Sequence, residues 1–165
     1  YLAFVRGVVS AAAGEIDQPM GRPDQGLPLL MTVREDGAPA RTEYRVVARA
    51  PDHTLADPHP LTGRQHQLRV HLAWLGHPIV ADKLYGPEGT ATFLEYVDAG
   101  EVTPYLAARL GHDRHALHAR RLVLRHPRTD EELTMEAPLA ADLVALWERL
   151  GGDARSTRAV PTGTS

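Results

Sequence analysis

One stretch, residues 62–86, constrains the fold of this chain more than any other. Its apolar residues recur at i, i+4 and i+7, which places them on one face of a helix: Leu68, Leu72 and Leu75. Thr62, followed three residues later by Gln65, predicts a capping box at the start of this helix. Gly76 supplies the left-handed residue that commonly ends a helix. The sequence therefore predicts a helix over residues 63–75.

The charge of this stretch is unusual for a purely structural helix. Arg64 falls in the predicted first turn, where the helix dipole is already positive and a carboxylate would be favoured. Arg69 follows, and no Asp or Glu occurs between Asp57 and Asp82. Free N–H groups with added cations favour an anion such as phosphate or a carboxylate from elsewhere. The alternative is a basic helix face exposed to solvent.

The order of residues here resembles a known family. Residues 62–71 read TGRQHQLRVH and residues 76–86 read GHPIVADKLYG, a pattern similar to that of the RluA-type RNA pseudouridine synthases. Three further stretches agree with the family's pattern: YLAFVRG at 1–7, ARTEY at 40–44, and LHA at 117–119 with the later HP and AP pairs. The resemblance spans Tyr1 to about Leu150. It implies a domain that isomerises uridine to pseudouridine in RNA without a metal or an organic cofactor.

The resemblance implies two catalytic residues. Tyr1 matches the tyrosine that stacks on the target base and assists removal of the C5 proton; a strand tyrosine packed in the core is the structural alternative. Arg69 matches the arginine that pairs with the family's catalytic aspartate, a task suited to a guanidinium because it binds a carboxylate bidentately and stays charged.

Four more residues are implied in binding RNA. Arg64 matches an arginine that contacts phosphate or takes the place of the flipped base, and Leu117 matches an apolar residue of the uracil pocket, with core packing as its alternative. His66 and Gln67 are expected to hold the helix and a neighbouring loop by hydrogen bonds rather than to do chemistry.

One family motif does not occur in the chain. The family's nucleophile is the aspartate of an HRLDxxTSG segment upstream of the tyrosine strand, whereas this sequence starts at the tyrosine. No other aspartate before the central helix stands in the required context: Asp17, Asp24, Asp36, Asp52 and Asp57. We therefore expect the chain to be an N-terminally truncated catalytic domain that is inactive alone, with Arg69 lacking its carboxylate partner. The alternative is a non-catalytic RNA-binding remnant.

Composition sets further bounds. The absence of cysteine excludes disulfides and thiolate metal sites, and no apolar run is long enough to span a membrane. We expect a cytoplasmic monomer whose partner is ribosomal or transfer RNA. The net charge of -3 argues mildly against nucleic acid, but residues 109–128 carry six arginines against one acidic residue, Asp113.

The nine histidines prompt a metal hydrolase as a rival. However, His112 and His118 would lie on one face of a strand and His115 on the other, and His66 and His71 would be about 140° apart on a helix. We therefore predict no metal site.

The remaining pattern predicts an α+β fold with a mostly antiparallel mixed sheet and a few packed helices. Expected strands cover residues 1–10, 14–17, 54–60 (weakened by two prolines), 116–124 and 132–135, and residues 29–35 and 40–49 are expected to pair across an Asp36-Gly37 turn. A loop is expected at 18–31, helical turns at 92–97 and 104–110, and an amphipathic helix at 139–150. Residues 1–150 form the expected domain and 151–165 a disordered tail.

Overall fold

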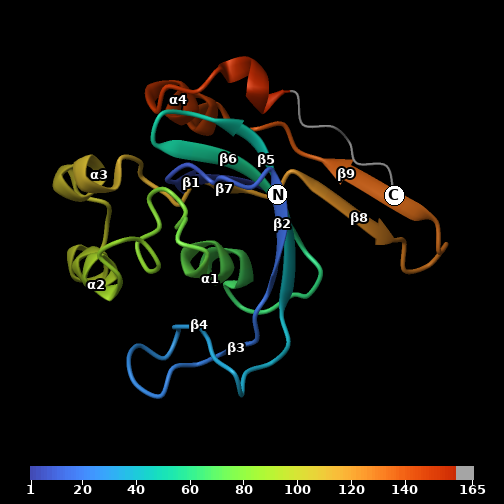
Figure 1. Cartoon of the computed structure of the whole chain (residues 1–165), viewed down its shortest axis with the longest axis horizontal. Coiled ribbons are helices and arrows are strands. Elements are labelled where there is room, and N and C mark those ends of the chain that lie inside the picture. Colours follow the sequence, from blue (N-terminus) through green and yellow to red (C-terminus); the bar gives the residue numbers. More distant parts are fainter. Residues whose placement is uncertain (159–165) are drawn as a thin grey trace.

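The computed structural model describes residues 1–158 and has the predicted α+β architecture, with one main antiparallel sheet and four α-helices (Figure 1). The strand order of the main sheet is β2-β5-β6-β1-β7. Its strands are β1 (Leu2–Arg6), β2 (Ala13–Asp17), β5 (Arg41–Arg49), β6 (His53–Pro60) and β7 (Leu117–His118). Two smaller two-stranded sheets flank it: β3 (Met20–Gly21) with β4 (Thr32–Val33), and β8 (Arg121–Arg125) with β9 (Glu132–Glu136).

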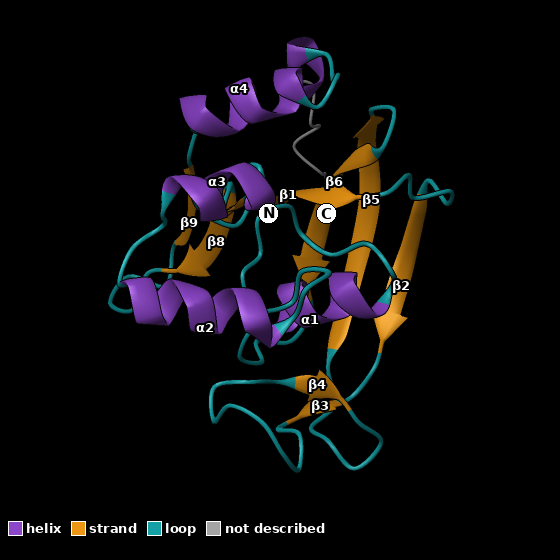
Figure 2. Ribbon diagram, turned by 90° about the vertical axis from the view of Figure 1, so that its left-hand side faces the viewer, coloured by secondary structure: helices purple, strands orange, loops and turns teal. Residues whose placement is uncertain are grey.

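Strand β1 lies at the centre of the core. Residues 2–5 are all buried, so both faces of the strand are covered, and the strand ends where Gly7 adopts a left-handed φ of 79°. Helix α4 (Ala141–Arg149) packs on one face, where the rings of Phe4 and Trp147 lie 5.6 Å apart. Helix α1 (Gln67–Trp74) lies on the opposite side of β1 and β6 from α4 (Figures 1 and 2).

Helix α1 starts four residues later than predicted, and the expected capping box is wrong. The Thr62 hydroxyl accepts a hydrogen bond from the Arg41 N–H of β5 and donates one to the Gln67 side chain, and it caps no backbone N–H of the helix. His66, with a left-handed φ of 57°, stands at the N-cap position without a capping side chain. Arg64 therefore lies in the loop before α1, and not in its first turn. The predicted apolar stripe is nevertheless present, because Leu68 and Leu72 are buried.

Strand β6 is more regular than its two prolines suggested. Pro58 and Pro60 lie opposite Tyr44 and Thr42 of β5, while the pairing of β6 with β1 covers only residues 53–56. The prolines thus lie beyond the stretch that is bonded to β1, and their missing N–H groups interrupt no bond to that strand.

The predicted hairpin across Asp36-Gly37 is wrong in its partners. The turn forms, since the Gly37 N–H bonds the Arg34 carbonyl, but β4 (Thr32–Val33) pairs with β3 (Met20–Gly21) and not with β5. Strand β5 pairs with β2 and β6 instead. The chain around Gly37 presses against the backbone of Met20, where a β-carbon would lie 2.5 Å from the carbonyl carbon.

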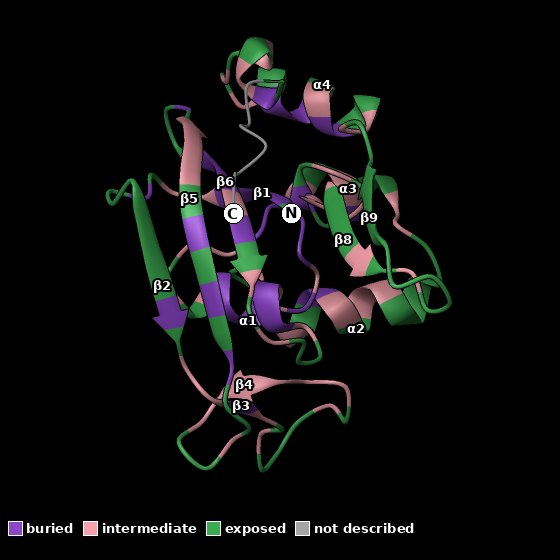
Figure 3. Ribbon diagram, turned by 90° about the vertical axis from the view of Figure 1, so that its right-hand side faces the viewer, coloured by how far each residue is buried: buried purple, intermediate pink, exposed green. Residues whose placement is uncertain are grey.

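The single strand predicted for residues 116–124 is divided between two sheets. Residues 117–118 pair with β1, and the chain then leaves the main sheet to form β8 (Arg121–Arg125), which pairs with β9 (Glu132–Glu136) as expected. The β8–β9 hairpin is exposed on both faces (Figure 3). Its apolar face carries three large side chains that are more than a third exposed: Leu122, Leu133 and Met135.

The predicted local helices are confirmed. They are α2 (Thr90–Ala99), α3 (Pro104–Leu110) and α4, whose Leu143, Leu146 and Trp147 are buried. The segment expected to be a tail begins with an ordered turn and a short 3-10 helix, η1 (Ala154–Thr157), over which the Trp147 indole N–H bonds the Ser156 hydroxyl. The rest of that segment, 159–165, lies outside the described residues.

Candidate functional site

A pocket of about 210 Å³ brings together all six residues singled out from the sequence. It lies where the start of β1, the loop between β6 and α1, the first turn of α1, and β7 meet. Its lining includes Tyr1, Arg64, His66, Gln67, Arg69 and Leu117. No carboxylate lines it among residues 1–158.

Arg69 is held by a carboxylate from its own motif. Its Nε and Nη2 donate to the two oxygens of Asp82, each at 2.7 Å, in a bidentate pair. The Asp82 side chain is fully buried and that of Arg69 is 17% exposed. The expectation that Arg69 lacks a carboxylate partner is therefore wrong in this structure. The N–H groups of Nη1, and one of Nη2, are not engaged by Asp82.

Asp82 owes its position to the turn that follows it. Its Oδ1 also accepts the backbone N–H groups of Leu84 and Tyr85, each at 2.9 Å. Burial alone would raise the pKa of Asp82, but the bond to Arg69 and these N–H groups hold that pKa below its usual value. The carboxylate is thus ionised at neutral pH, and both of its oxygens accept hydrogen bonds within the protein.

Tyr85 supports both Arg69 and His66. The Arg69 guanidinium carbon lies 4.8 Å from the centre of the Tyr85 ring, a cation–π contact. The Tyr85 hydroxyl accepts the Met31 N–H at 3.0 Å and lies 2.8 Å from His66 Nδ1. The Tyr85 hydroxyl thus joins the Met31 backbone to the His66 ring.

The surroundings of His66 favour the neutral form of its ring. Burial and the nearby Arg69 lower the pKa of His66. The left-handed conformation of His66 turns the chain sharply into α1 and places its ring against that of Tyr85, with the ring centroids 5.6 Å apart.

A buried chain of hydrogen bonds fixes α1 to strand β5. The Gln67 amide donates to the Arg41 carbonyl at 2.8 Å and to the Thr42 hydroxyl at 3.0 Å, while its oxygen accepts from Thr62 and from the Arg64 N–H. These bonds engage the whole Gln67 amide.

The Thr42 hydroxyl continues the chain to His71. It lies 2.9 Å from His71 Nδ1, and His71 Nε2 lies 3.0 Å from the Gln18 carbonyl. Since a carbonyl only accepts, His71 carries its proton on Nε2 and is neutral. Burial lowers the pKa of His71 accordingly.

The other predicted residues form the edges of the pocket. Tyr1 is 39% exposed, so its ring is not packed in the core. Leu117 is half-buried beside β1, opposite Ala3. The Arg64 Nε donates to the Pro39 carbonyl at 3.0 Å, with the side chain at the surface. Their roles in binding RNA remain predictions.

The arginine-rich segment at 109–128 is less basic than its sequence suggests. Arg109 pairs with Glu88 and Glu95, and Arg114 pairs with Asp142. The arginines of β8 face acids of the same hairpin, since Arg121 and Arg125 lie 3.7 and 3.6 Å from Glu136 and Asp130. Acids on other elements and in the same hairpin thus balance much of this charge.

The histidines of the metal-hydrolase rival are engaged elsewhere. His112 Nε2 lies 3.2 Å from Asp142 and His118 Nε2 3.1 Å from the Ala137 carbonyl. Within residues 1–158, no three His, Cys, Asp or Glu side chains gather as a metal site would need. Nor does any helix in this part of the chain have the length and apolar character to cross a membrane.

Comparison with known proteins decides the family. A family model described as RNA pseudouridylate synthase matches residues 1–74. The Bacillus subtilis protein named "Uncharacterized RNA pseudouridine synthase YlyB" is 39% identical over 150 residues, which cover 91% of this chain and 43% of the relative. The chain belongs to the RluA-type RNA pseudouridine synthase family.

Other members agree. Ribosomal large subunit pseudouridine synthase D of Vibrio parahaemolyticus is 40% identical over 147 residues, which cover 86% of this chain and 42% of the relative. The solved human RNA pseudouridylate synthase domain containing 4 is 26% identical, with a TM-score of 0.64 over 90% of this chain and 60% of that one. This RluA-type chain thus spans less than half the length of the curated relatives named here.

Sequence reasoning missed the residues that hold the site together. Asp82 and Tyr85 stand in the quoted GHPIVADKLYG segment, yet their contacts with Arg69 and His66 were not predicted. One signal was available: Asp82 is the first acidic residue after a long basic stretch, and two residues later the chain offers free N–H groups in a turn.

Proposed function

We propose that the protein to which this chain belongs isomerises uridine to pseudouridine in RNA, and that residues 1–150 are part of its catalytic domain. The observation that supports this most is the pocket in which Tyr1 and Arg69 meet, with the arginine held rigidly by Asp82. The ribosomal names of several relatives make ribosomal RNA the first substrate to test, and transfer RNA the second.

In this proposal Arg69 presents its outer N–H groups to a second carboxylate. Asp82 occupies the edge formed by Nε and Nη2, so the groups left on Nη1 and Nη2 can bind one more acid in a planar fork. That acid is the catalytic aspartate, which breaks the C1′–N1 bond as a carboxylate near the anomeric carbon does in glycoside cleavage. No described residue of this chain supplies it, so it comes from outside these residues.

Tyr1, Leu117 and Arg64 then receive the target nucleotide. A flipped uracil would stack on the half-exposed Tyr1 ring against the apolar Leu117 side chain. After the base has rotated, the C5 proton leaves as the C1′–C5 bond forms, and the Tyr1 hydroxyl assists this transfer. Arg64, exposed at the rim, contacts a backbone phosphate or takes the place of the flipped base.

The test uses RNA labelled with tritium at C5 of uridine, because isomerisation must release that hydrogen to water. We expect release by the native gene product on ribosomal or transfer RNA and none by the 165-residue chain. Arg69→Met in the native product should abolish release, while Arg128→Gln, an exposed arginine on the hairpin turn, should not. Failure of the native product on both RNAs, or steady release by the chain alone, would refute the proposal.

A non-catalytic RNA-binding protein is the second candidate, favoured by the absence of a carboxylate from the pocket lining. Its signature is affinity for RNA that falls steeply with salt, without release of tritium by any form of the protein. The ion pairs on Arg109, Arg114, Arg121 and Arg125 weaken the basic surface on which this reading relied.

A further inference from the structure

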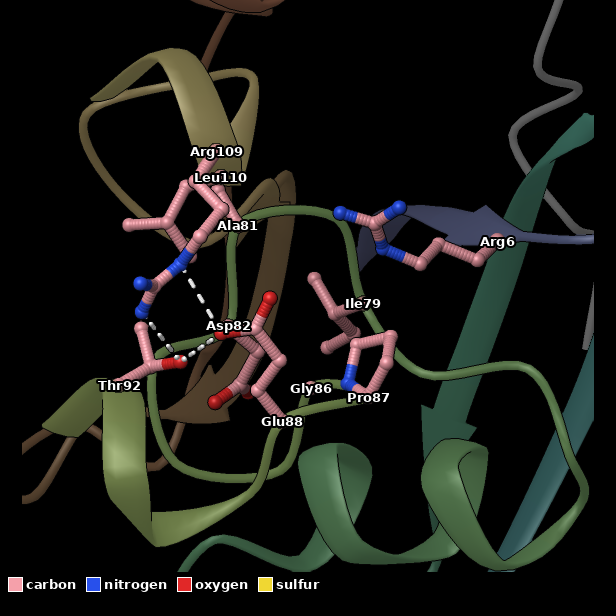
Figure 4. Close-up of a pocket in the computed structure, with 10 residues that line it drawn as sticks. All are labelled: Arg6, Ile79, Ala81, Asp82, Gly86, Pro87, Glu88, Thr92, Arg109 and Leu110. Carbon is pink, nitrogen blue, oxygen red and sulfur yellow. Dashed lines mark hydrogen bonds and ion pairs between the residues drawn. The ribbon is translucent and has the colours of Figure 1, made fainter. Parts of the chain in front are cut away.

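A second pocket, of about 180 Å³, has its charged side chains largely paired within the chain. Asp82, Glu88 and Arg109 line it (Figure 4). Asp82 is engaged by Arg69, and Arg109 pairs with Glu88 and Glu95. The β8–β9 hairpin, by contrast, leaves large apolar side chains at the surface.

The hairpin is amphipathic. Its register places Leu122 opposite Met135 and Leu124 opposite Leu133, and these four side chains lie on one face because residues alternate between the faces of a strand. The other face pairs an arginine with a glutamate at each end and carries Thr134 between them. Such alternation is typical of an antiparallel sheet that has one face packed on a core and the other in solvent.

The part of the chain that the structure describes does not cover the apolar face. Leu122 is 55% and Met135 49% exposed (Figure 3). Within residues 1–158 each strand of the hairpin pairs only with the other, so both outer edges lack a neighbouring strand. A two-stranded hairpin alone is at best marginally stable in water. The hairpin therefore has the pattern of a half-buried sheet without the layer that would bury it.

The size of this face favours a segment of the same polypeptide over a second copy of the chain. Two strands of five residues cover about 17 Å by 10 Å, or about 170 Å². A stable interface between separate proteins buries about 800 Å² on each partner, whereas a tethered segment gains from its high effective concentration. A protein of the length of the curated relatives has more chain outside these residues than within them.

We propose that a segment of the native protein outside this chain docks on the β8–β9 hairpin. The segment adds a strand to an outer edge of the hairpin, and the layer that it begins covers Leu122, Leu133 and Met135. Its chemistry is that of an amphipathic strand, with main-chain groups that complete the edge and apolar side chains on the face toward the hairpin. The docking does not depend on the proposed RNA chemistry.

The base of the hairpin is fixed beside the pocket that holds Tyr1 and Arg69. His118, next to the pocket residue Leu117, pairs with Leu2 of β1, and its Nε2 lies 3.1 Å from the Ala137 carbonyl at the end of β9. A segment docked on the hairpin thus begins within a few residues of the pocket, where the proposed function needs a carboxylate from outside the described residues. This consequence, unlike the docking itself, rests on the proposed function.

The test places the photo-crosslinker p-benzoylphenylalanine at Leu133 in the native gene product. The matched control carries it at Thr134, which is the next residue but lies on the opposite face of the hairpin. Mass spectrometry of the crosslinked peptides identifies what covers each face. We expect the crosslinker at Leu133 to join a peptide from outside this chain within one molecule, and the crosslinker at Thr134 to give little of that product.

A second measurement compares Leu133→Glu with Thr134→Glu by thermal unfolding of the native product. Leu133→Glu should lower the Tm by several degrees because it places a charge under the docked layer, and Thr134→Glu, on the solvent face, should not. Both positions are exposed in this chain, so equal shifts would mean that the face is bare and would overturn the proposal.

Three crosslinking results would also overturn it: a crosslinked dimer, which means that a second copy covers the face; a crosslink to residues of this chain; and no crosslink, or equal yields at both positions. Tritium release from labelled RNA is measured separately on the same native product. A protein that gives the expected crosslink but no release contradicts the proposed function and leaves the docking supported.

Discussion

Substituting Asp82 by asparagine tests the central contact of the site. The change leaves the Arg69 guanidinium largely buried without its carboxylate. The asparagine oxygen can still accept the N–H groups of Leu84 and Tyr85, but its NH2 group then faces the Arg69 Nε–H, donor against donor. Breaking a buried pair in this way costs about 3–5 kcal/mol, or about 6–20 °C in Tm for a chain of this size.

A double substitution distinguishes the contribution of the Arg69–Asp82 ion pair to stability from that of the hydrogen bonds between Asp82 and the following turn. Arg69→Met alone strands a fully buried carboxylate and should cost a similar amount. Adding Asp82→Asn to Arg69→Met removes that charge and keeps the acceptor for Leu84 and Tyr85, so the double variant should be more stable than either single one. Urea unfolding at pH 7, followed by circular dichroism, measures all four proteins.

The pH dependence provides the control. Because the pKa of Asp82 is lowered in the folded state, its contribution is present above the unfolded value of about 3.9 and is lost as pH falls through the folded pKa. Asp82→Asn should lack this acid-dependent loss. Additive losses in the double variant, or a loss below about 1 kcal/mol for Asp82→Asn, would refute the reasoning.

Three further substitutions test the supporting network. Tyr85→Phe removes the hydroxyl bound to His66 and should cost about 1–3 kcal/mol in urea unfolding; an unchanged midpoint would contradict the bond. His71 is buried and neutral with a lowered pKa, so its contribution is complete above about pH 6.5 and declines as pH falls through the folded value. His71→Gln should flatten the stability profile between pH 7 and 5, and a profile as steep as that of the parent would count against it. Gly37→Ala places a β-carbon 2.5 Å from the Met20 backbone and should cost about 1–3 kcal/mol, whereas Gly63→Ala, which meets no atom within 4 Å, should not; equal losses in both would show that the close approach does not matter.

The sequence predicted the parts of the fold that depend on neighbouring residues. Helix α3 was expected as a helical turn at 104–110, where the structure adds a Thr103 cap, and helix α4 was expected because Leu143, Leu146 and Trp147 give it an apolar face. The β8–β9 hairpin was predicted from the strand pattern at 116–124, the turn after it and the second strand at 132–135. Each of these signals lies within about a dozen residues, where periodicity and turn chemistry are informative.

The failures came from contacts that are distant in the sequence. Thr62 reads as a helix cap until Arg41, twenty-one residues earlier, donates to its hydroxyl. The strand before Gly37 was expected to pair with the strand after it. In the structure, Met20 and its neighbour Gly21 are its partners instead. Local pattern could not rank these competing partners, because the competing donors and acceptors come from other strands.

The candidate site shows the same contrast between local signals, which were predicted, and distant contacts, which were not. Its six predicted residues meet in one pocket, but the residues that fix their geometry lie on other elements or after the helix. Gln67 bonds β5, His71 reaches Gln18, and Arg69 is held from behind by Asp82. The motif therefore encodes a rigid support for one guanidinium as much as it encodes chemistry.

Most of the motif's side chains serve the structure of the site, and this limits what a motif match implies about activity. In TGRQHQLRVH, the side chains of Thr62, Gln67 and His71 are fully engaged within the protein, and Arg69 turns one edge inward to Asp82. In the proposed function, this motif presents the outer edge of Arg69 and the surface of Arg64 to the substrate. Neither can act as the nucleophile. In that proposal, a chain can carry the whole motif, fold around it and hold Arg69 against Asp82, and still depend for catalysis on a carboxylate from outside the described residues.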